Sequence, residues 1–347
     1  MPENGRDIVL AKAKSRDWCL CVFFSVDLEG ATAYKVETRA QKGNEDWCAA
    51  FETFYEDFPE QFLGEYMSFD QSKATLGISD SVKPCLWKLV GDEILLYAPL
   101  RDSRQILEHI RSFGQAIVLY NKRLRDEHKT VQCKGTAWIG GFPVNNRIVI
   151  PQDLTVDFVG SSINCGFRLT KFSSPRRLTV SLDLLWMFME SLQCTAANQY
   201  DGIKFKYHGD HELKGVFSGK RYPVFWYDLS REGECVEDRW VLPTPNCEAD
   251  HIIKFCEKIK GKTKYYDFIR PFIIDDPSGL FNAEPGLFEM FESLRQALPA
   301  YKEKGQKRLL DDGEKHDLTE PKEMPDNILS LPPLLDAIDD SVVVLGK

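Results

Sequence analysis

The amino-acid sequence predicts an α+β fold, in which a mixed antiparallel sheet carries helices on one face. Two observations lead to this prediction. Short strand-like runs alternate with amphipathic helical runs through the first 230 residues, and some of the strand-like runs come as closely spaced pairs. An order of strand, helix, strand pair, helix and strand is typical of a ferredoxin-like arrangement.

The first predicted strand covers residues 18–26, and every position in it except Ser25 is an apolar or sulfur-containing residue. Because the run is rich in aromatic and β-branched side chains, we expect it to be buried on both faces. It ends at Asp27 and Gly30. A helix is predicted over 45–58, where aromatic side chains recur at every third or fourth position. Residues 59–82 are mixed in character, which predicts an inserted connection.

The same alternation continues to about residue 230. A tight turn at Gly91-Asp92-Glu93 between two apolar runs predicts a hairpin. The predicted elements are, in order, strands at 86–90 and 94–97, a helix at 103–127, strands at 131–144 and 147–150, a helix at 162–170, a strand at 178–181, an apolar helix at 184–189, and a closing hairpin that includes Val216 and 223–227.

The character of the sequence changes near residue 231. We therefore expect a folded domain at 17–230 and a C-terminal extension at 231–347. Helices are predicted near 249–260 and 285–300. The last part of the extension is charged and contains proline, which predicts a flexible end.

The composition excludes several classes of protein. Lys and Arg total 44 against 53 Asp and Glu, a formal charge of −9, whereas a general nucleic-acid binder normally presents a basic face. No apolar run approaches the roughly 18 residues of a membrane span, and the first residues lack the apolar core of a signal peptide. The ten cysteines include no Cys-x-x-Cys pair, which favours reduced thiols. We expect a cytoplasmic protein without membrane insertion.

Two of the three segments that carry chemistry contain carboxylates on turns. The segment at 25–32 places Asp27 at the end of the buried strand, followed by a glycine and a hydroxyl residue. The segment at 88–93 places Asp92 at a hairpin tip, with Lys88 four residues before it. Taken alone, each is typical of an ordinary turn.

The third segment, at 157–169, contains Asp157, Asn164 and Arg168. The last two stand at helical i, i+4 spacing, so that both project from one helix face. Alone, such a pair is typical of a solvated face. Together and in this order, however, the three segments resemble the class III nucleotidyl cyclases, the catalytic domains of adenylyl, guanylyl and related cyclases.

Two further stretches support the resemblance, which covers residues 17–230. Residues 175–181 are similar to the segment after the catalytic helix of that family, and 213–216 with 223–224 resemble its final hairpin. The resemblance implies the class III cyclase fold and an enzyme, a phosphorus–oxygen lyase that cyclises a nucleoside triphosphate and releases pyrophosphate.

The resemblance also implies roles for individual residues. Asp27, Asp92 and the backbone carbonyl of Leu28 would hold two divalent metal ions, and oxygen ligands of this kind suit Mg²⁺ or Mn²⁺. Asn164 would orient the ribose. Arg168 would neutralise charge that builds on the α-phosphoryl oxygens.

The terminal phosphates and the assembly are assigned in the same way. Lys214 would meet the terminal phosphates, and free backbone N–H groups at 30–32 could cradle phosphate. In this family the metal half and the Asn–Arg half of one site come from different protomers. One copy of each half in this chain implies a symmetric homodimer with two equivalent sites.

The nucleobase is read in this family at the positions of Lys88 and Asp157. A lysine–aspartate pair is similar to the adenine-reading pair of adenylyl cyclases, so ATP is one candidate substrate. Against it stand three aromatic side chains near these positions, Tyr34, Trp87 and Phe158, which could fill the volume of a purine or simply pack in the core.

The whole chain resembles the bacterial pyrimidine cyclases of anti-phage signalling. This resemblance implies conversion of UTP to cyclic UMP, a messenger that activates a neighbouring effector. Three alternatives stay open: a cytidylate cyclase acting on CTP, an adenylyl cyclase acting on ATP, and a catalytically silent homologue that only binds a nucleotide or a partner. Both aspartates and the Asn–Arg pair are intact, which argues against the silent homologue.

Overall fold

The structure of the protein is a computed structural model. It describes residues 4–15, 17–42, 44–68, 82–143, 146–150, 156–195, 203–216, 221–229, 246–260, 269–286, 289, 292–293 and 296. The chain divides into two compact units, 1–296 and 297–347, and all described residues belong to the first. Among them, no helix has the length and apolar character needed to cross a membrane.

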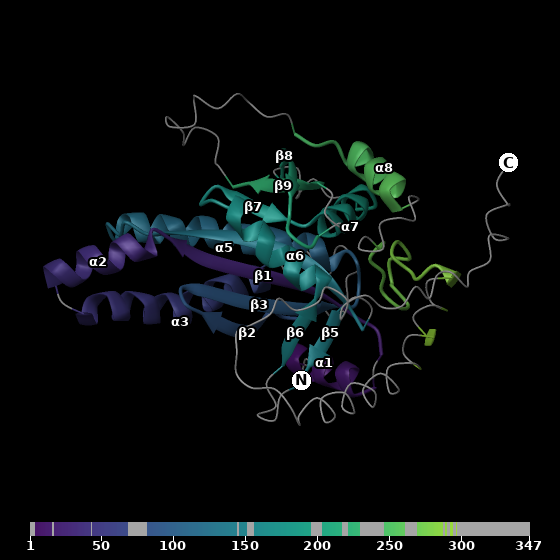
Figure 1. Cartoon of the computed structure of the whole chain (residues 1–347), viewed down its shortest axis with the longest axis horizontal. Helices are drawn as coiled ribbons and strands as arrows, with labels where there is room; N and C mark the ends of the chain where they lie inside the picture. Colours follow the sequence, from purple (N-terminus) through teal and green to yellow (C-terminus); the bar gives the residue numbers. More distant parts are fainter. Residues whose placement is uncertain are drawn as a thin grey trace, which may run out of the picture. The chain divides into compact units, whose positions relative to one another are not determined.

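A seven-stranded sheet forms the centre of this unit, in the strand order β2-β3-β1-β4-β7-β9-β8, beside a separate pair β5-β6 (Figure 1). The strands are β1 (Cys19–Glu29), β2 (Cys85–Val90), β3 (Glu93–Leu100), β4 (Gln132–Phe142), β5 (Asn146–Val149), β6 (Asp157–Gly160), β7 (Arg177–Val180), β8 (Phe205–Glu212) and β9 (Arg221–Asp228). The β4–β7 pairing is parallel and the other described pairings are antiparallel. The predicted α+β class with a mixed sheet is confirmed.

Strand β1 is buried on both faces, as its sequence predicts. Val22 and Phe24 belong to a large apolar cluster on one face of the sheet. Cys21 and Phe23 belong to a smaller cluster on the other face, because successive side chains of a strand point in opposite directions. The strand therefore anchors two cores at once.

Helices cover both faces of the sheet, so the prediction that they lie on one face is wrong. The helices are α1 (Gly5–Ser15), α2 (Ala31–Lys42), α3 (Asn44–Ser68), α5 (Gln105–Asp126), α6 (Ser161–Leu169), η1 (Thr170–Phe172), α7 (Leu182–Gln193) and α8 (Ala249–Lys260). The large cluster contains residues of α3, α5 and α7. The smaller cluster contains Val9 of α1 and Phe158 of β6.

Helix α3 is longer than its sequence pattern suggested. The expected connection from residue 59 is helical as far as Ser68, with Pro59 inside the helix. Phe62 and Tyr66 continue the apolar spacing after Phe58 and are almost fully buried, so tertiary packing sustains the helix past the proline. Residues 69–81, the rest of the expected connection, lie outside the described residues.

The closing hairpin is formed by β8 and β9, and its first strand lies earlier than predicted. Val216 is in the turn after β8 rather than in a strand. Strand β8 is at the edge of the sheet and only Phe205 in it is buried, so it lacks the continuous apolar run that marks β1.

Residues beyond 230 add to the core of the same unit. Helix α8 agrees with its predicted range and buries Ile252 and Cys256. The Trp18 ring stacks on Phe272 with centroids 3.8 Å apart, and its indole N–H donates to the Phe272 carbonyl at 2.7 Å. Part of the predicted extension is thus packed, while the boundary near 230 stays a prediction. Most of the expected helix at 285–300 lies outside the described residues.

Candidate active site

The predicted metal ligands Asp27, Leu28 and Asp92 lie at the same end of the sheet. Asp27 is near the end of β1 and pairs in register with Glu93, the first residue of β3, while Asp92 is in the turn just before it. The β2–β3 turn is fixed from α3, because the Tyr55 hydroxyl donates to the Gly91 carbonyl. Two segments far apart in sequence therefore bring three acidic residues to one end of the sheet.

Lys134 balances part of this negative charge. It stands opposite Asp27 on β4, and its Nζ lies 3.2 Å from Asp27 Oδ2. Glu93 accepts a hydrogen bond from the Ser25 hydroxyl. Burial raises the pKa of Glu93, and the charges of Asp27 and Asp92 raise it further, against the lowering effects of Ser25 and Lys134.

The donor chemistry of this end of the sheet fits a hard divalent cation. Its potential ligands are carboxylate oxygens and main-chain carbonyls, the groups that Mg²⁺ and Mn²⁺ prefer. Within the described ranges, no three His, Cys, Asp or Glu side chains converge into a metal cluster. Asp27 is bound to Lys134 instead, so a cation at Asp27 would compete with that ammonium group.

Lys88 and Asp157 meet, as the family resemblance implied. Lys88 Nζ lies 2.8 Å from Asp157 Oδ1, and the same oxygen accepts hydrogen bonds from the Trp87 indole N–H and the Phe158 backbone N–H, each at 2.9 Å. Burial raises the pKa of Asp157, but these donors outweigh it, and the net shift is downward. Asp157 is therefore held as a carboxylate with Oδ1 fully used.

The pair remains open to a ligand. The Lys88 and Asp157 side chains are 38% and 39% exposed. Trp87 forms a firm wall beside them, because its ring packs edge-on against Phe158 and Phe23 at centroid distances of 5.1 and 5.6 Å. The Lys88 ammonium lies 4.4 Å from the centre of the Trp87 ring.

Helix α6 carries the Asn–Arg pair on the same side of the molecule as β6. It begins directly after Gly160, whose φ of 145° suits glycine. Gly166 lies so close to Trp138 that an added Cβ would stand 2.1 Å from the indole ring. Asn164 is exposed. Arg168 is half-buried, and its Nε is a buried donor without a hydrogen-bond partner among the described residues.

Not all predicted site residues come together within one chain. Of the interactions in the described part of the chain, none joins Asp27 or Asp92 to Asn164 or Arg168. Lys214 is exposed in the turn after β8. The structure describes one chain, so the sharing of a site between two protomers stays a prediction.

Tyr34 is not brought to the Lys88–Asp157 pair. It belongs to the large cluster, on the face covered by α3, α5 and α7, and lines a small cavity with Leu28 and Phe51. Its hydroxyl accepts a hydrogen bond from Lys129 at 3.3 Å. Trp87 and Phe158, by contrast, pack in or against the smaller cluster on the opposite face. Of the three aromatic candidates, only these two lie next to the Lys88–Asp157 pair, through the bonds of the Trp87 indole and the Phe158 backbone N–H to Asp157.

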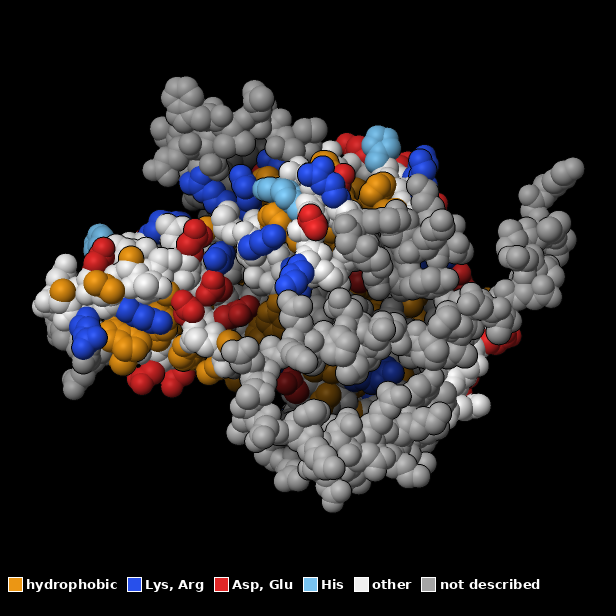
Figure 2. Space-filling view, viewed as in Figure 1, with side chains coloured by type: hydrophobic (Ala, Val, Ile, Leu, Met, Phe, Trp, Pro, Cys, Tyr) orange, Lys and Arg blue, Asp and Glu red, His pale blue; other side chains and the backbone are white. Residues whose placement is uncertain are grey.

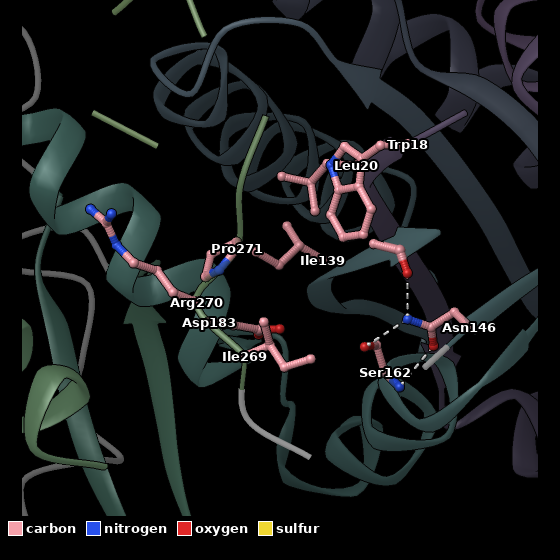
Figure 3. Close-up of a pocket in the computed structure, with 10 residues that line it drawn as sticks. Trp18, Leu20, Ile139, Asn146, Ser162, Asp183, Ile269, Arg270 and Pro271 are labelled. Atoms are coloured by element: carbon pink, nitrogen blue, oxygen red, sulfur yellow. Dashed lines mark hydrogen bonds between the residues drawn. The ribbon is translucent and has the colours of Figure 1, made fainter. Parts of the chain in front are cut away.

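A second cavity lies away from these residues (Figure 3). It is bounded by Trp18, Asp183 and the segment 269–271, and by Asn146, whose side-chain amide donates to the Gly141 carbonyl at 2.9 Å and to the Ser162 hydroxyl at 3.1 Å. None of the predicted site residues lines it. Burial raises the pKa of Asp183 to about 6, although bonds from Ser181 and the Leu184 N–H oppose this shift.

Sequence reasoning did not assign roles to Lys134, Glu93 or Ser25. Lys134 faces Asp27 only through the β1–β4 register, which no local pattern reveals. Glu93 was visible at the hairpin tip, but its bond to Ser25 depends on the β1–β3 pairing. The signal available in the sequence was that Glu93 is the only charged residue of the apolar strand β3.

Solved structures with a similar arrangement include several nucleotide cyclases. The adenylyl cyclase CyaB from P. aeruginosa aligns with 16% identity over 62% of this chain and 97% of its own, with a TM-score of 0.41. The guanylate cyclase domain of RhGC from Catenaria anguillulae, in complex with GTP, aligns with 14% identity over 61% and 97%, with a TM-score of 0.38. An adenylate/guanylate cyclase/hydrolase from Silicibacter pomeroyi aligns with 16% identity over 61% of this chain and 98% of its own, with a TM-score of 0.37.

No protein-family model matches the sequence, and no curated protein matches it. Because the structural similarities are distant, the proposed function rests on the chain's own residues.

Proposed function

We propose that the protein is a class III nucleotide cyclase that converts UTP to 3′,5′-cyclic UMP and pyrophosphate. The observation that carries the proposal is the 2.8 Å ion pair of Lys88 and Asp157. It joins two of the three motif segments, 69 residues apart, at an exposed position suited to a nucleobase. Asp157 is also the residue that leads, through β6, into the helix with Asn164 and Arg168.

The reaction forms one P–O bond and breaks another. The ribose 3′-oxygen attacks the α-phosphorus, the bond from the α-phosphorus to the bridging oxygen breaks, and pyrophosphate leaves while the 3′-hydroxyl proton is released to water. Divalent metals bound by Asp27, Asp92 and the Leu28 carbonyl would supply positive charge to the triphosphate and to the 3′-oxygen.

Protein side chains hold the remaining groups. Asn164 is exposed on α6 and can donate to the ribose. Arg168 has an unused buried N–H, and its planar guanidinium can bind two oxygens of the α-phosphate as their charge increases. Lys214, exposed in its turn, can contact the terminal phosphates.

The assembly that we propose is a homodimer with a site at each end of the interface. Within the described part of one chain, no hydrogen bond or ion pair joins Asp27 or Asp92 to Arg168, which supports a site completed by a second protomer. A two-fold axis would place the partner's Asn–Arg helix against the carboxylates twice, giving two equivalent sites.

The preference for a pyrimidine is argued from shape rather than from charge. Asp157 presents Oδ2 as an acceptor beside the Lys88 ammonium donor, and uracil, cytosine, adenine and guanine each offer an adjacent donor and acceptor that this pair can bind. Discrimination between the bases must therefore come from the size of the space available to the base. Trp87, whose ring packs against the buried Phe158, restricts the space beside the pair, which favours a one-ring base.

CTP and ATP remain the second candidates. Cytosine offers its amine to Asp157 and its N3 to Lys88, so charge does not distinguish it from uracil. ATP is favoured by the lysine–aspartate pair itself. By resemblance to the pyrimidine cyclases, we further propose that the cyclic product acts in the bacterial cytoplasm as an anti-phage messenger for a neighbouring effector.

The proposal is tested by incubating the purified protein with each nucleoside triphosphate and Mn²⁺, and by following cyclic product and pyrophosphate together. We expect equal amounts of both from UTP, and no turnover by the Asp27→Ala and Asp92→Ala variants, whose substitutions lie outside the core and should leave folding intact. A folded wild-type protein that binds nucleotides but releases no pyrophosphate from any of them would identify a silent homologue.

A further inference from the structure

We propose that His208 and His211 form a binding site for a divalent transition-metal ion, separate from the carboxylate end of the sheet. Both residues belong to β8, the edge strand of the closing hairpin. His208 Nδ1 and His211 Nε2 are 2.9 Å apart, and His208 is exposed. Figure 2 shows pale-blue histidine side chains at the surface in the region of the hairpin strands.

The backbone of β8 is shaped so that the two imidazoles meet. In a regular strand, residues three apart point to opposite faces. Here the register shifts between Tyr207 and Gly209, and the resulting bulge turns His208 to the side of His211. Gly209 has a φ of 128°, a conformation that L-residues rarely adopt, and a Cβ there would lie 3.5 Å from His211 Nε2.

Phe172 holds both rings in place. Its centroid lies 4.6 Å from the His211 ring and 5.4 Å from the His208 ring. A neutral imidazole offers one ring-nitrogen lone pair to a metal, so two adjacent imidazoles can act as a pair of ligands.

The spacing of the two nitrogens indicates the kind of metal. With metal–nitrogen bonds of about 2.0–2.1 Å, two ligands at 90° are about 2.9 Å apart, whereas a tetrahedral angle needs about 3.3 Å. The 2.9 Å separation of the two nitrogens matches the cis positions of Cu²⁺ or Ni²⁺, which favour square or octahedral geometry with imidazole, and metal binding would replace the hydrogen bond between the rings. Water would complete the shell, because among the described residues no third His, Cys, Asp or Glu side chain converges on the pair.

The site lies close along the chain to the hairpin turn that carries Lys214. Lys214 follows His211 by three residues, in the turn that ends β8. A metal that bridges the two histidines would close the bulge and restrain the approach to that turn. Binding itself, however, does not depend on the proposed cyclase activity, because it needs no nucleotide.

The test is titration of the full chain with Ni²⁺ by calorimetry, in excess Mg²⁺ to occupy the carboxylates, and electron paramagnetic resonance of bound Cu²⁺. We expect one Ni²⁺ per chain, a Cu²⁺ spectrum split by two nitrogens, and at least a tenfold loss of affinity in His208→Ala, in His211→Gln and in the double variant. His251→Ala, which removes an exposed histidine of α8, is the matched control and should bind normally.

All three variants keep every cysteine, so residual thiol binding would appear equally in each. Circular dichroism of the variants checks that β8 remains folded, and His211→Gln preserves the volume of the site if truncation disturbs it. Unchanged Ni²⁺ affinity in the folded double variant, or a Cu²⁺ spectrum with one nitrogen, would show a hydrogen-bonded histidine pair only and would overturn the proposal.

Discussion

Arg168 carries a buried N–H donor that finds no acceptor among the described residues. An unsatisfied buried donor costs on the order of 1–3 kcal/mol, so this side chain is kept at the expense of stability. We expect Arg168→Met, which preserves the apolar stem, to unfold at the same temperature as the wild type or higher. Its cyclase rate should fall by roughly 10²–10³-fold, because a transition-state donor is lost. Parallel loss of activity and thermal stability would instead identify a structural arginine.

Trp87 combines a hydrogen bond to Asp157 with a rigid ring beside the proposed base site. Trp87→Ala should raise the rate with ATP relative to UTP, by up to roughly 10–200-fold, since pocket shape of this kind is worth about 1–3 kcal/mol. Trp87→Phe keeps most of the ring and removes the N–H, so it should retain the UTP preference. The quantity to measure is the ratio of the cyclisation rate with ATP to that with UTP, for the wild type and both variants.

Tyr34→Ala provides the comparison for Trp87. Tyr34 packs in the core on the other face, so its loss should lower the unfolding temperature and leave the ATP-to-UTP ratio near the wild-type value. If the ATP-to-UTP rate ratio changed in Tyr34→Ala and not in Trp87→Ala, Tyr34 and not Trp87 would line the base site.

Asp183 gives stability a defined pH dependence. Its pKa is raised by burial to about 6, against about 4 in an unfolded chain. Between these values the folded protein keeps a proton that the unfolded chain has lost, so this residue lowers stability as pH rises from 4 to 6, by at most about 3 kcal/mol.

Asp183→Asn keeps an acceptor for Ser181 and the Leu184 N–H and removes the titration. The unfolding free energy of this variant minus that of the wild type should therefore increase between pH 4 and pH 7, as measured with denaturant. A difference that is flat over this range would contradict the raised pKa.

At the scale of elements, the contact between α6 and β4 positions the Asn–Arg pair. Gly166→Ala would drive a Cβ into the Trp138 ring, and overpacking of this kind typically costs about 1–3 kcal/mol. We expect a lower unfolding temperature and a reduced cyclase rate as α6 shifts. Gly64→Ala in α3 is the matched control, because its Cβ meets nothing within 4 Å and alanine favours a helix by about 1 kcal/mol. Equal stability of both variants would contradict the close packing.

The elements that sequence reasoning predicted are those with strong local patterns. Strand β1, the β2–β3 hairpin, α5 and α8 each have a continuous apolar run, a glycine turn or a clear helical period. Helices α1 and α2 were not predicted, since neither has a strong apolar stripe. Strand β8 was not predicted because one of its faces is polar and its bulge interrupts the period.

The order of the motifs along the sequence predicted which residues belong to the candidate site, but not the contacts that distant strands create. The resemblance implied that Lys88 and Asp157 would act together, and the structure places them in contact. The bond from Trp87 to Asp157 and that from Lys134 to Asp27 depend on β-pairing between distant segments. Tyr34 was assigned from sequence proximity to the first motif, whereas the face that it occupies follows from the packing of α2 on the sheet.

At the scale of the whole molecule, the proposed dimer predicts complementation. Asp27→Ala and Arg168→Ala should each be inactive as homodimers. In a mixed dimer both lesions fall in one site and the other is intact, so an equal mixture should recover about one quarter of the wild-type activity after subunit exchange. Exchange is followed with two differently labelled chains. No recovery in a sample that demonstrably exchanges would mean that each site is built within one chain.

The central claim, a cyclase with a pocket for a one-ring base, is tested most directly by competition. The wild-type protein is incubated with Mn²⁺ and an equimolar mixture of ATP, GTP, CTP and UTP, and the cyclic products are separated by chromatography. We expect cyclic UMP to exceed cyclic AMP at least tenfold, a difference of about 1.4 kcal/mol in the barrier. Cyclic AMP as the main product would contradict the account and make Lys88 and Asp157 an adenine-reading pair.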